Sequence, residues 1–180
     1  QCSKYSNLSC ALTKEINKTD KQNGGIYFTP PDTIRKNLDF LRPFFDEHID
    51  IGTKKTVLEP SCGSCEFISK LTNMSTNIHI TGMELNKTIF NSIQHYEADN
   101  IVLVNDDYLT HKFQDSFDLI IGNPPFIVMK KSAVDKSYHR YFDGRPNIFI
   151  LFIIKSLGLL NDKGIVSFVL PKNFLNCLYY

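Results

Sequence analysis

The stretch with the clearest capacity for chemistry is Asn123-Pro124-Pro125-Phe126. It follows an apolar run at residues 117–121, and such a branched run before a turn signal predicts a buried strand. The prolines fix φ and lack N–H groups, and Pro124 keeps Asn123 out of helical geometry. The sequence therefore predicts a stiff corner at the carboxyl end of a strand. This corner offers an amide side chain, carbonyls without competing N–H partners, and an aromatic face.

The corner suits the activation of an amino group attached to a planar ring or a carbonyl. Such a nitrogen is a poor nucleophile because its lone pair is delocalised. Two acceptors for its hydrogens, Asn123 Oδ1 and the Pro124 carbonyl, favour a more pyramidal and more nucleophilic nitrogen. Phe126 can stack on the flat group and hold it in place. The alternative is a proline-rich turn with an incidental asparagine.

A loop of small residues follows the first predicted strand, at residues 56–58, and precedes a helix predicted over residues 67–73. The strand ends at Glu59, and the loop is Pro60-Ser61-Cys62-Gly63-Ser64-Cys65. Small residues let a ligand approach N–H groups at the amino terminus of a helix. A plain strand-to-helix connection is the alternative.

Two further acids follow predicted strands. Glu84 follows the strand predicted at residues 79–83, where this architecture binds ribose hydroxyls. Its alternative role is that of a solvated residue beside the helix predicted over residues 86–98. Asp107 follows the strand predicted at residues 101–104 and can accept from an adenine amino group, or it only caps a turn.

The most basic stretch, at residues 127–144, lacks helical periodicity. Lys130, Lys131 and Arg140 lie in it, and their charges suit phosphate groups beside a site. An ordinary solvated loop is the alternative. After this stretch the sequence predicts an apolar helix over residues 147–160, a turn, and a fifth strand at residues 165–170.

Alternating strands and helices predict an α/β fold with a doubly wound, mostly parallel sheet. Ligands bind such sheets at the carboxyl ends of strands, near the switch in strand order. Residues 1–24 are predicted to form a polar N-terminal tail or a loose helix around residues 8–16, ended by Gly24-Gly25. A helix is predicted over residues 32–48, which Pro43 should kink or end early.

Composition sets broad limits. A chain of 180 residues is long enough for one domain with a hydrophobic core. Its net charge of +1 argues against a strongly basic surface for nucleic-acid binding. Neither a membrane span nor a signal peptide is predicted. Cys62 and Cys65 fit a zinc or redox pair, or small residues in a tight loop; without a histidine cluster we predict no metal and a reduced, cytoplasmic protein. Because the chain begins at Gln1, we expect a fragment or a processed chain.

Taken together, these motifs resemble those of the S-adenosylmethionine-dependent N6-adenine DNA methyltransferases whose cofactor motifs precede target recognition, as in restriction–modification enzymes. Phe126 replaces the commoner tyrosine of the catalytic motif. The matching stretches are residues 25–30, 58–63, 84, 107–109, 123–126, 147–149 with Phe152, and 168–175.

The resemblance implies a Rossmann-like methyltransferase fold over residues 25–180, and methyl transfer from S-adenosylmethionine to the N6 amine of adenine. It implies that Asn123, Pro124, Pro125 and Phe126 form the catalytic corner, with Phe126 stacked on an adenine flipped out of double-stranded DNA. It implies that the cofactor contacts Tyr27, Thr29, Pro30, Glu59, Pro60, Ser61, Cys62, Gly63, Glu84, Leu85, Asp107, Tyr108, Asn123, Pro125 and Phe152.

Two features depart from the family pattern. Cys65 occupies the position of a second glycine in the cofactor loop. The sequence ends at Tyr180, before the two further strands and the target-recognition domain that the resemblance implies, so we expect a domain truncated at its C-terminus. Alternatives are methylation of a protein glutamine or an RNA base, and a methyltransferase-like module that binds a partner without catalysis.

Overall fold

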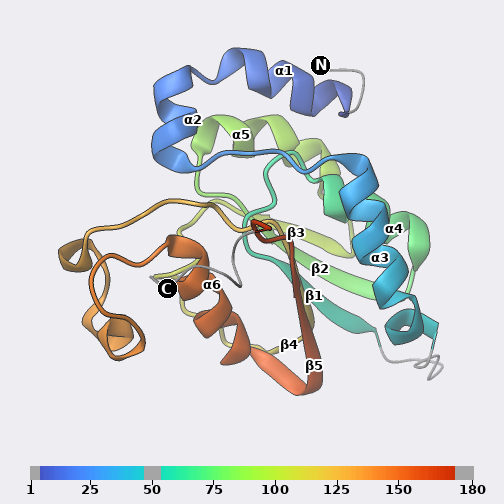
Figure 1. Cartoon of the computed structure of the whole chain (residues 1–180). Helices are drawn as coiled ribbons and strands as arrows, with labels where there is room; N and C mark the ends of the chain where they lie inside the picture. The colour runs from blue at the N-terminus through green and yellow to red at the C-terminus, as the bar shows by residue number, and fades with distance from the viewer. Residues whose placement is uncertain (1–4, 47–53, 173–180) are drawn as a thin grey trace.

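The protein is described by a computed structural model that covers residues 5–46 and 54–172 (Figure 1). Its centre is a five-stranded sheet in the order β3-β2-β1-β4-β5, and every pair of neighbouring strands is parallel. The strands are β1 (Lys55–Glu59), β2 (Ile78–Met83), β3 (Ile101–Val104), β4 (Phe117–Gly122) and β5 (Leu160–Phe168). This topology confirms the predicted doubly wound sheet.

The strand order reverses between β1 and β4. Chain order runs outward from β1 to β3 on one side and from β4 to β5 on the other. Val57 pairs with Leu119 and Leu58 with Ile120, so the two strands end side by side. The predicted cofactor loop and the Asn-Pro-Pro-Phe corner therefore leave the sheet next to each other, at the switch point where such folds bind ligands.

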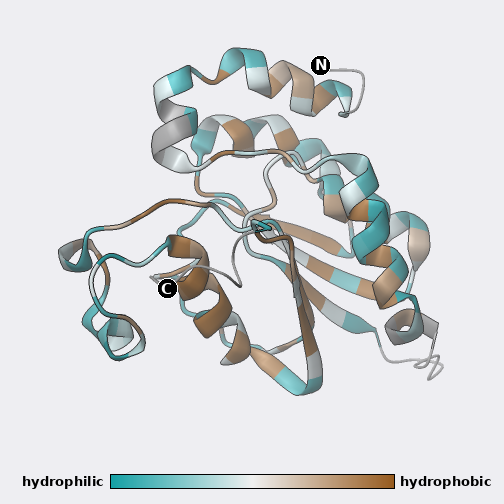
Figure 2. Ribbon diagram, in the orientation of Figure 1, coloured by the Kyte–Doolittle hydropathy of each residue, from teal (hydrophilic) through white to brown (hydrophobic). Residues whose placement is uncertain are grey.

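Helices cover both faces of the sheet. Helices α3 (Pro31–Asp46) and α4 (Glu66–Met74) pack on one face, where Ile34, Phe67 and Ile68 are buried with alternate strand residues. Helix α6 (Ile148–Leu157) packs on the other face through Phe152. Figure 2 shows that α6 and the strands are the most apolar part of the ribbon, as expected of elements that share a core.

Two helices precede the sheet, α1 (Asn7–Glu15) and α2 (Lys18–Gly24). Leu12 and Ile16 are buried against Ile89 of α5 (Lys87–Ile93), and α1 lies beside α5 in Figure 1. Ser9 of α1 also hydrogen bonds to Ser64, at 2.8 Å between their hydroxyl oxygens. Of the two alternatives for residues 1–24, a helix is the one found around residues 8–16, and it is packed on the fold rather than loose.

Three predicted helices end earlier than expected, or outside the described residues. Helix α3 continues through Pro43 to Asp46, and the predicted end at residue 48 lies outside the described residues. Helix α5 stops at Ile93, and a 3₁₀ turn (Gln94–Tyr96) follows it. Helix α6 stops at Leu157, because the chain must turn at Gly158 to enter β5.

Strand β5 begins five residues before the predicted start at residue 165, at Leu160. Phe117 pairs with Leu160 but Leu119 pairs with Ile165, so the predicted turn at residues 161–164 survives as a bulge within the strand. Lys163 has a φ of 63° there, as a turn residue would. The extra residues are accommodated because Gly164 lies against the Phe117 carbonyl, where a Cβ would be only 2.9 Å away.

The basic stretch is more ordered than its lack of periodicity indicated. It contains two 3₁₀ helices, Lys131–Ala133 and Lys136–Tyr141. Val134 and Phe142 pack on Leu151 of α6 in a small core of their own. This core holds the stretch against α6, although Figure 1 shows it as an excursion from the body of the fold.

The amino ends of three strands are joined by one carboxylate. Asp118 accepts hydrogen bonds from the Thr56 backbone N–H of β1 at 2.8 Å and from the Asn161 side chain of β5 at 2.8 Å. Burial raises the pKa of Asp118, but the hydrogen bonds from Thr56 and Asn161 outweigh burial and lower it. The ionised form therefore holds this end of the sheet together.

None of the helices in the described part of the chain is long and apolar enough to cross a membrane.

The packing of α1 can be tested with Leu12→Ala. Leu12 is 1% exposed, so its truncation should leave a cavity and lower the free energy of unfolding by about 2–5 kcal/mol. The control is Leu157→Ala on α6, whose side chain is 61% exposed and should cost about 0.5 kcal/mol or less. Urea denaturation measures both, and equal stabilities of the two variants would show that α1 is not packed as described.

Candidate active site

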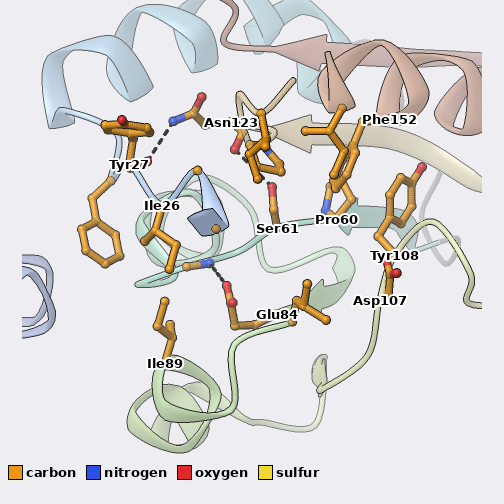
Figure 3. A pocket seen from close by; sticks show the side chains of 18 of the residues that line it. Ile26, Tyr27, Pro60, Ser61, Glu84, Ile89, Asp107, Tyr108, Asn123 and Phe152 are labelled. Carbon is orange, nitrogen blue, oxygen red and sulfur yellow. Dashed lines mark hydrogen bonds between the residues drawn. The ribbon is translucent and has the colours of Figure 1, made fainter. Parts of the chain in front are cut away.

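A cavity of about 200 Å³ lies at the carboxyl ends of β1, β2 and β4 (Figure 3). Its walls come from segments far apart in the sequence, from Gly24 before the sheet to Phe152 in α6. The predicted cofactor residues that line it are Tyr27, Pro60, Ser61, Gly63, Glu84, Leu85, Asp107, Tyr108, Asn123, Pro125 and Phe152. The structure therefore brings together side chains that the sequence placed at separate strand ends.

A smaller cavity of about 30 Å³ adjoins it and shares Tyr27, Ser61, Gly63 and Asn123. Thr29, Glu59 and Cys62, also predicted to contact the cofactor, line this second space. Pro30 lines neither cavity. Its carbonyl instead accepts hydrogen bonds from the N–H groups of Thr33 and Ile34 and so starts α3.

Glu59 is a buried acid without a cation beside it. Its side chain is 2% exposed, and Oε2 has no hydrogen-bond partner among the described residues. Burial raises the pKa of Glu59 well above its usual value, and the nearby Cys65, Glu84 and Glu66 raise it further. An unpaired buried carboxyl group is costly, so its position beside a cavity is suited to a ligand that brings a positive charge or a donor.

Glu84 is fixed by backbone donors from both sides. Its Oε2 accepts from the Gly63 N–H at 3.0 Å, which Figure 3 shows, and Oε1 accepts from the Asn86 N–H at 2.7 Å. Burial raises the pKa of Glu84, and these N–H groups oppose the rise. Each carboxylate oxygen keeps a further lone pair, which suits two neighbouring hydroxyl groups.

Asp107 caps a turn, which was one of its two predicted roles. Its Oδ1 accepts from the Leu109 N–H at 2.9 Å, and the residue also lines the larger cavity. Both predicted roles are therefore compatible with its position, since a carboxylate has more than one acceptor site.

An aromatic wall stands beside this turn. Tyr108 contacts the Phe152 ring with 4.7 Å between centroids and hydrogen bonds to the Ser156 hydroxyl at 2.9 Å. Burial raises the pKa of the Tyr108 hydroxyl, so it stays neutral. Lys155 donates to the carbonyls of Leu109 and His111, at 3.0 and 2.6 Å, and so ties the turn to α6. The faces of these two rings suit contact with an aromatic ring of a ligand.

The predicted catalytic corner, residues 123–126, has one buried side-chain acceptor without a partner among the described residues. The Asn123 side chain donates through Nδ2 to the Tyr27 carbonyl at 3.1 Å, while Oδ1 is buried and has no partner among the described residues. The Ser61 hydroxyl donates to the Asn123 backbone carbonyl at 3.1 Å, so the cofactor loop and the corner are joined directly (Figure 3). A buried amide oxygen without a donor is unusual in a native structure and marks a place for a ligand.

The remaining predicted residues surround this corner. Pro124 is buried, and the Phe126 ring packs edge-on against Phe149 of α6 with 5.8 Å between centroids. Lys130, Lys131 and Arg140 are exposed on the basic stretch, and the Arg140 guanidinium lies over the Tyr141 ring. No described cavity includes Phe126 or the two lysines, so their predicted contacts concern the surface outside the cofactor pocket.

Cys62 and Cys65 belong to the predicted cofactor loop, and both are buried in the main core. Cys65 adopts a left-handed backbone with φ 60°, a conformation that glycine adopts without steric cost. A hydrogen bond with Cys65 and burial both raise the pKa of the Cys62 thiol. Across residues 5–46 and 54–172, no group of three or more His, Cys, Asp or Glu side chains is arranged to hold a metal ion.

Several lining residues were not predicted from the sequence. Four of them are isoleucines, and apolar side chains carry no signal that separates a pocket wall from the core. Gly25 did offer a signal, since a Gly-Gly pair before an aromatic motif could have indicated close backbone approach as well as the end of a helix. The unpredicted lining residues are Gly24, Gly25, Ile26, Phe28, Ile89, Asp106, Ile127 and Ile148.

Comparisons with known proteins agree with this geometry. A family model described as the Eco57I restriction-modification methylase matches residues 4–180, and the chain therefore belongs to that family. The modification methylase CviBIII of Paramecium bursaria Chlorella virus NC1A is 32% identical over 178 residues, which are 98% of this chain and 45% of that protein. The type II methyltransferase M.CvrRI of Paramecium bursaria Chlorella virus XZ-6E is 29% identical, over 98% of this chain and 44% of its own length.

The chain thus spans less than half the length of these two relatives. Among solved structures, precorrin-6y C5,15-methyltransferase from Geobacter metallireducens GS-15 matches with a TM-score of 0.55 and 14% identity. That match covers 83% of this chain and 68% of the other, and it supports the Rossmann-like methyltransferase fold.

The cofactor of this family is S-adenosylmethionine, and the pocket residues fit it. Glu84 offers two acceptors for ribose hydroxyls, and Tyr108 with Phe152 offers aromatic faces for the adenine ring. Glu59, whose Oε2 is buried without a partner among the described residues, suits the ammonium group of the methionine part. The fit rests on the donors and acceptors that the described residues leave unused.

The state of Glu59 predicts a pH-dependent stability. Because its pKa is raised in the folded protein, the stability that this group contributes is present at low pH and is lost as pH rises through that pKa. Glu59→Gln should therefore raise the melting temperature at pH 8 more than at pH 5, by about 2–4 °C for each kcal/mol gained. Thermal unfolding without added ligand measures this, and an equal shift at both pH values would contradict a raised pKa.

Proposed function

We propose that this chain is the catalytic part of a DNA methyltransferase that transfers the methyl group of S-adenosylmethionine to the N6 amine of adenine. The observation that carries the proposal is the unpartnered Asn123 Oδ1 at the end of β4, beside the cofactor pocket. Membership of the Eco57I restriction-modification methylase family supports DNA as the substrate.

The corner residues have distinct parts in the reaction. Asn123 Oδ1 and the Pro124 carbonyl accept the two hydrogens of the exocyclic amine, which concentrates electron density on its nitrogen. The Asn123 side chain donates to the Tyr27 carbonyl, and the Ser61 hydroxyl donates to the Asn123 backbone carbonyl, so Asn123 is held in place before the substrate arrives and its Oδ1 needs little reorganisation during transfer. When bound, S-adenosylmethionine supplies an electrophilic methyl group on a sulfonium.

Adenine inside a duplex cannot reach this corner, so the base must leave the stack. Phe126 then stacks on the flipped ring, and Phe149 braces Phe126 edge-on from α6. Lys130, Lys131 and Arg140 bind the phosphates beside the extruded nucleotide. Such contacts position the duplex but do not read its sequence.

Asn123→Ala tests the catalytic role. The variant should lose methyl transfer by about 10²–10³-fold or more because it removes a preorganised acceptor. The assay quantifies N6-methyladenine by mass spectrometry in unmethylated plasmid DNA.

The control is Asn73→Ala, an exposed amide on α4 that bonds only to the Ser69 carbonyl and should retain full activity. Methylation of a protein glutamine or of RNA, with none on DNA, would overturn the substrate assignment. Full activity of Asn123→Ala would overturn the site itself.

Glu84→Ala tests the cofactor pocket separately from the chemistry. Loss of a charged acceptor for ribose hydroxyls should weaken binding of S-adenosylhomocysteine by about 10–100-fold, since each such bond contributes about 1.5–3 kcal/mol. Isothermal calorimetry measures the dissociation constant. Glu15→Ala at the exposed end of α1 serves as the control, and equal affinities of the two variants would contradict the assigned pocket.

A further inference from the structure

The segment before α3 touches the catalytic corner at two points. The Tyr27 carbonyl accepts from Asn123 Nδ2 at 3.1 Å, and Gly25 lies against the backbone of Phe126, the last residue of the corner. Figure 3 shows the hydrogen bond that joins Asn123 to Tyr27 beside the pocket. The two contacts involve different residues of this segment: one is a hydrogen bond and the other is packing.

Gly25 occupies a position that no other residue can take without displacement. It is buried, and its φ is +58°. A Cβ at Gly25 would lie 2.7 Å from Ile127 Cγ1 and 3.1 Å from the Phe126 backbone nitrogen. Backbone atoms of the corner cannot move aside easily, so a side chain here must push residues 25–27 away from it.

The hydrogen bond to Tyr27 decides which end of the Asn123 amide faces the substrate. An asparagine side chain can present either its oxygen or its NH₂ group by a half-turn. A carbonyl only accepts, so the Tyr27 carbonyl holds the NH₂ end and leaves Oδ1 free. Only this orientation suits a substrate amine, because an amine that meets the NH₂ end finds a donor instead of an acceptor.

We infer that Gly25 is a positioning residue for methyl transfer: it seats the Tyr27 carbonyl against Asn123, and the carbonyl turns Asn123 Oδ1 toward the substrate amine. The inference rests on the proposed function, because the substrate amine that Oδ1 faces is the one named there. It assigns to residues 25–27 a part in orienting the catalytic amide, in addition to their place in the wall of the cofactor pocket.

The first experiment compares Gly25→Ala with wild type in single-turnover methylation of unmethylated plasmid DNA at saturating S-adenosylmethionine. We expect the rate to fall by about 10–100-fold, because small displacements of reacting groups have effects of this size. The loss should persist at saturation, in contrast to that of a residue that only binds cofactor. Adding Ile127→Ala removes the side-chain atoms that a Cβ would meet, and should restore part of the rate.

A second readout does not depend on activity. In ¹⁵N NMR spectra, the Asn123 side-chain amide, assigned by its absence in Asn123→Ala, should show slow hydrogen exchange in wild type and fast exchange in Gly25→Ala. Gly144→Ala is matched for backbone strain, with φ +85° but no atom within 4 Å of its Cβ. In that variant the exchange of the Asn123 amide should be unchanged.

If Gly25→Ala does not fold, an ester in place of the amide between Tyr27 and Phe28 tests the same contact without steric change. It weakens the Tyr27 acceptor and should slow transfer by about fivefold, equivalent to about 1 kcal/mol. The inference is overturned if the Asn123 amide stays protected in Gly25→Ala or in the ester, or if saturating cofactor restores the full rate. A wild-type protein that methylates no adenine would refute the proposed function alone, since the exchange measurement would still decide the orientation.

Discussion

The pairing of β1 with β4 is the constraint on which the site depends. These strands are distant in sequence, yet Leu58 lies opposite Ile120. The segments that follow the two strands therefore leave the sheet at the same level. From that level the hydroxyl of Ser61 reaches the backbone of Asn123. A slip of one residue in a strand reverses its side-chain pattern, and both strands have buried faces, so this register is strongly fixed. The predicted cofactor loop and the Asn-Pro-Pro-Phe corner are therefore held together by the register of the buried strands as well as by the Ser61 hydrogen bond.

Much of this arrangement could be predicted from local sequence. Short runs of Val, Leu and Ile before a turn located all five strands, because parallel strands buried on both faces have few polar residues. The acids and amide that follow those runs, such as Glu84 and Asn123, were predicted to converge because the carboxyl ends of parallel strands share one edge. The structure confirms the convergence of most of them in one cavity.

Contacts between distant segments could not be predicted, because a single sequence has no signal for them. The bond from Asn123 to Tyr27 spans 96 positions and involves a backbone carbonyl, a group that every residue possesses. The bulge in β5 depends on the neighbouring β4, and the packing of α1 depends on three aliphatic residues from two helices. The small core under the basic stretch was missed for the same reason, since Phe142 and Val134 follow no regular period.

The two ends of the sheet are built in different ways. At the amino end, Asp118 connects β1, β4 and β5 through its own hydrogen bonds, and these bonds form without a ligand. At the carboxyl end, the acceptors of Glu59 and Asn123 stay unused. Substitutions around Asp118 can therefore change the stability of the sheet without touching Glu59 or Asn123, because the two sets of contacts lie at opposite ends of the strands.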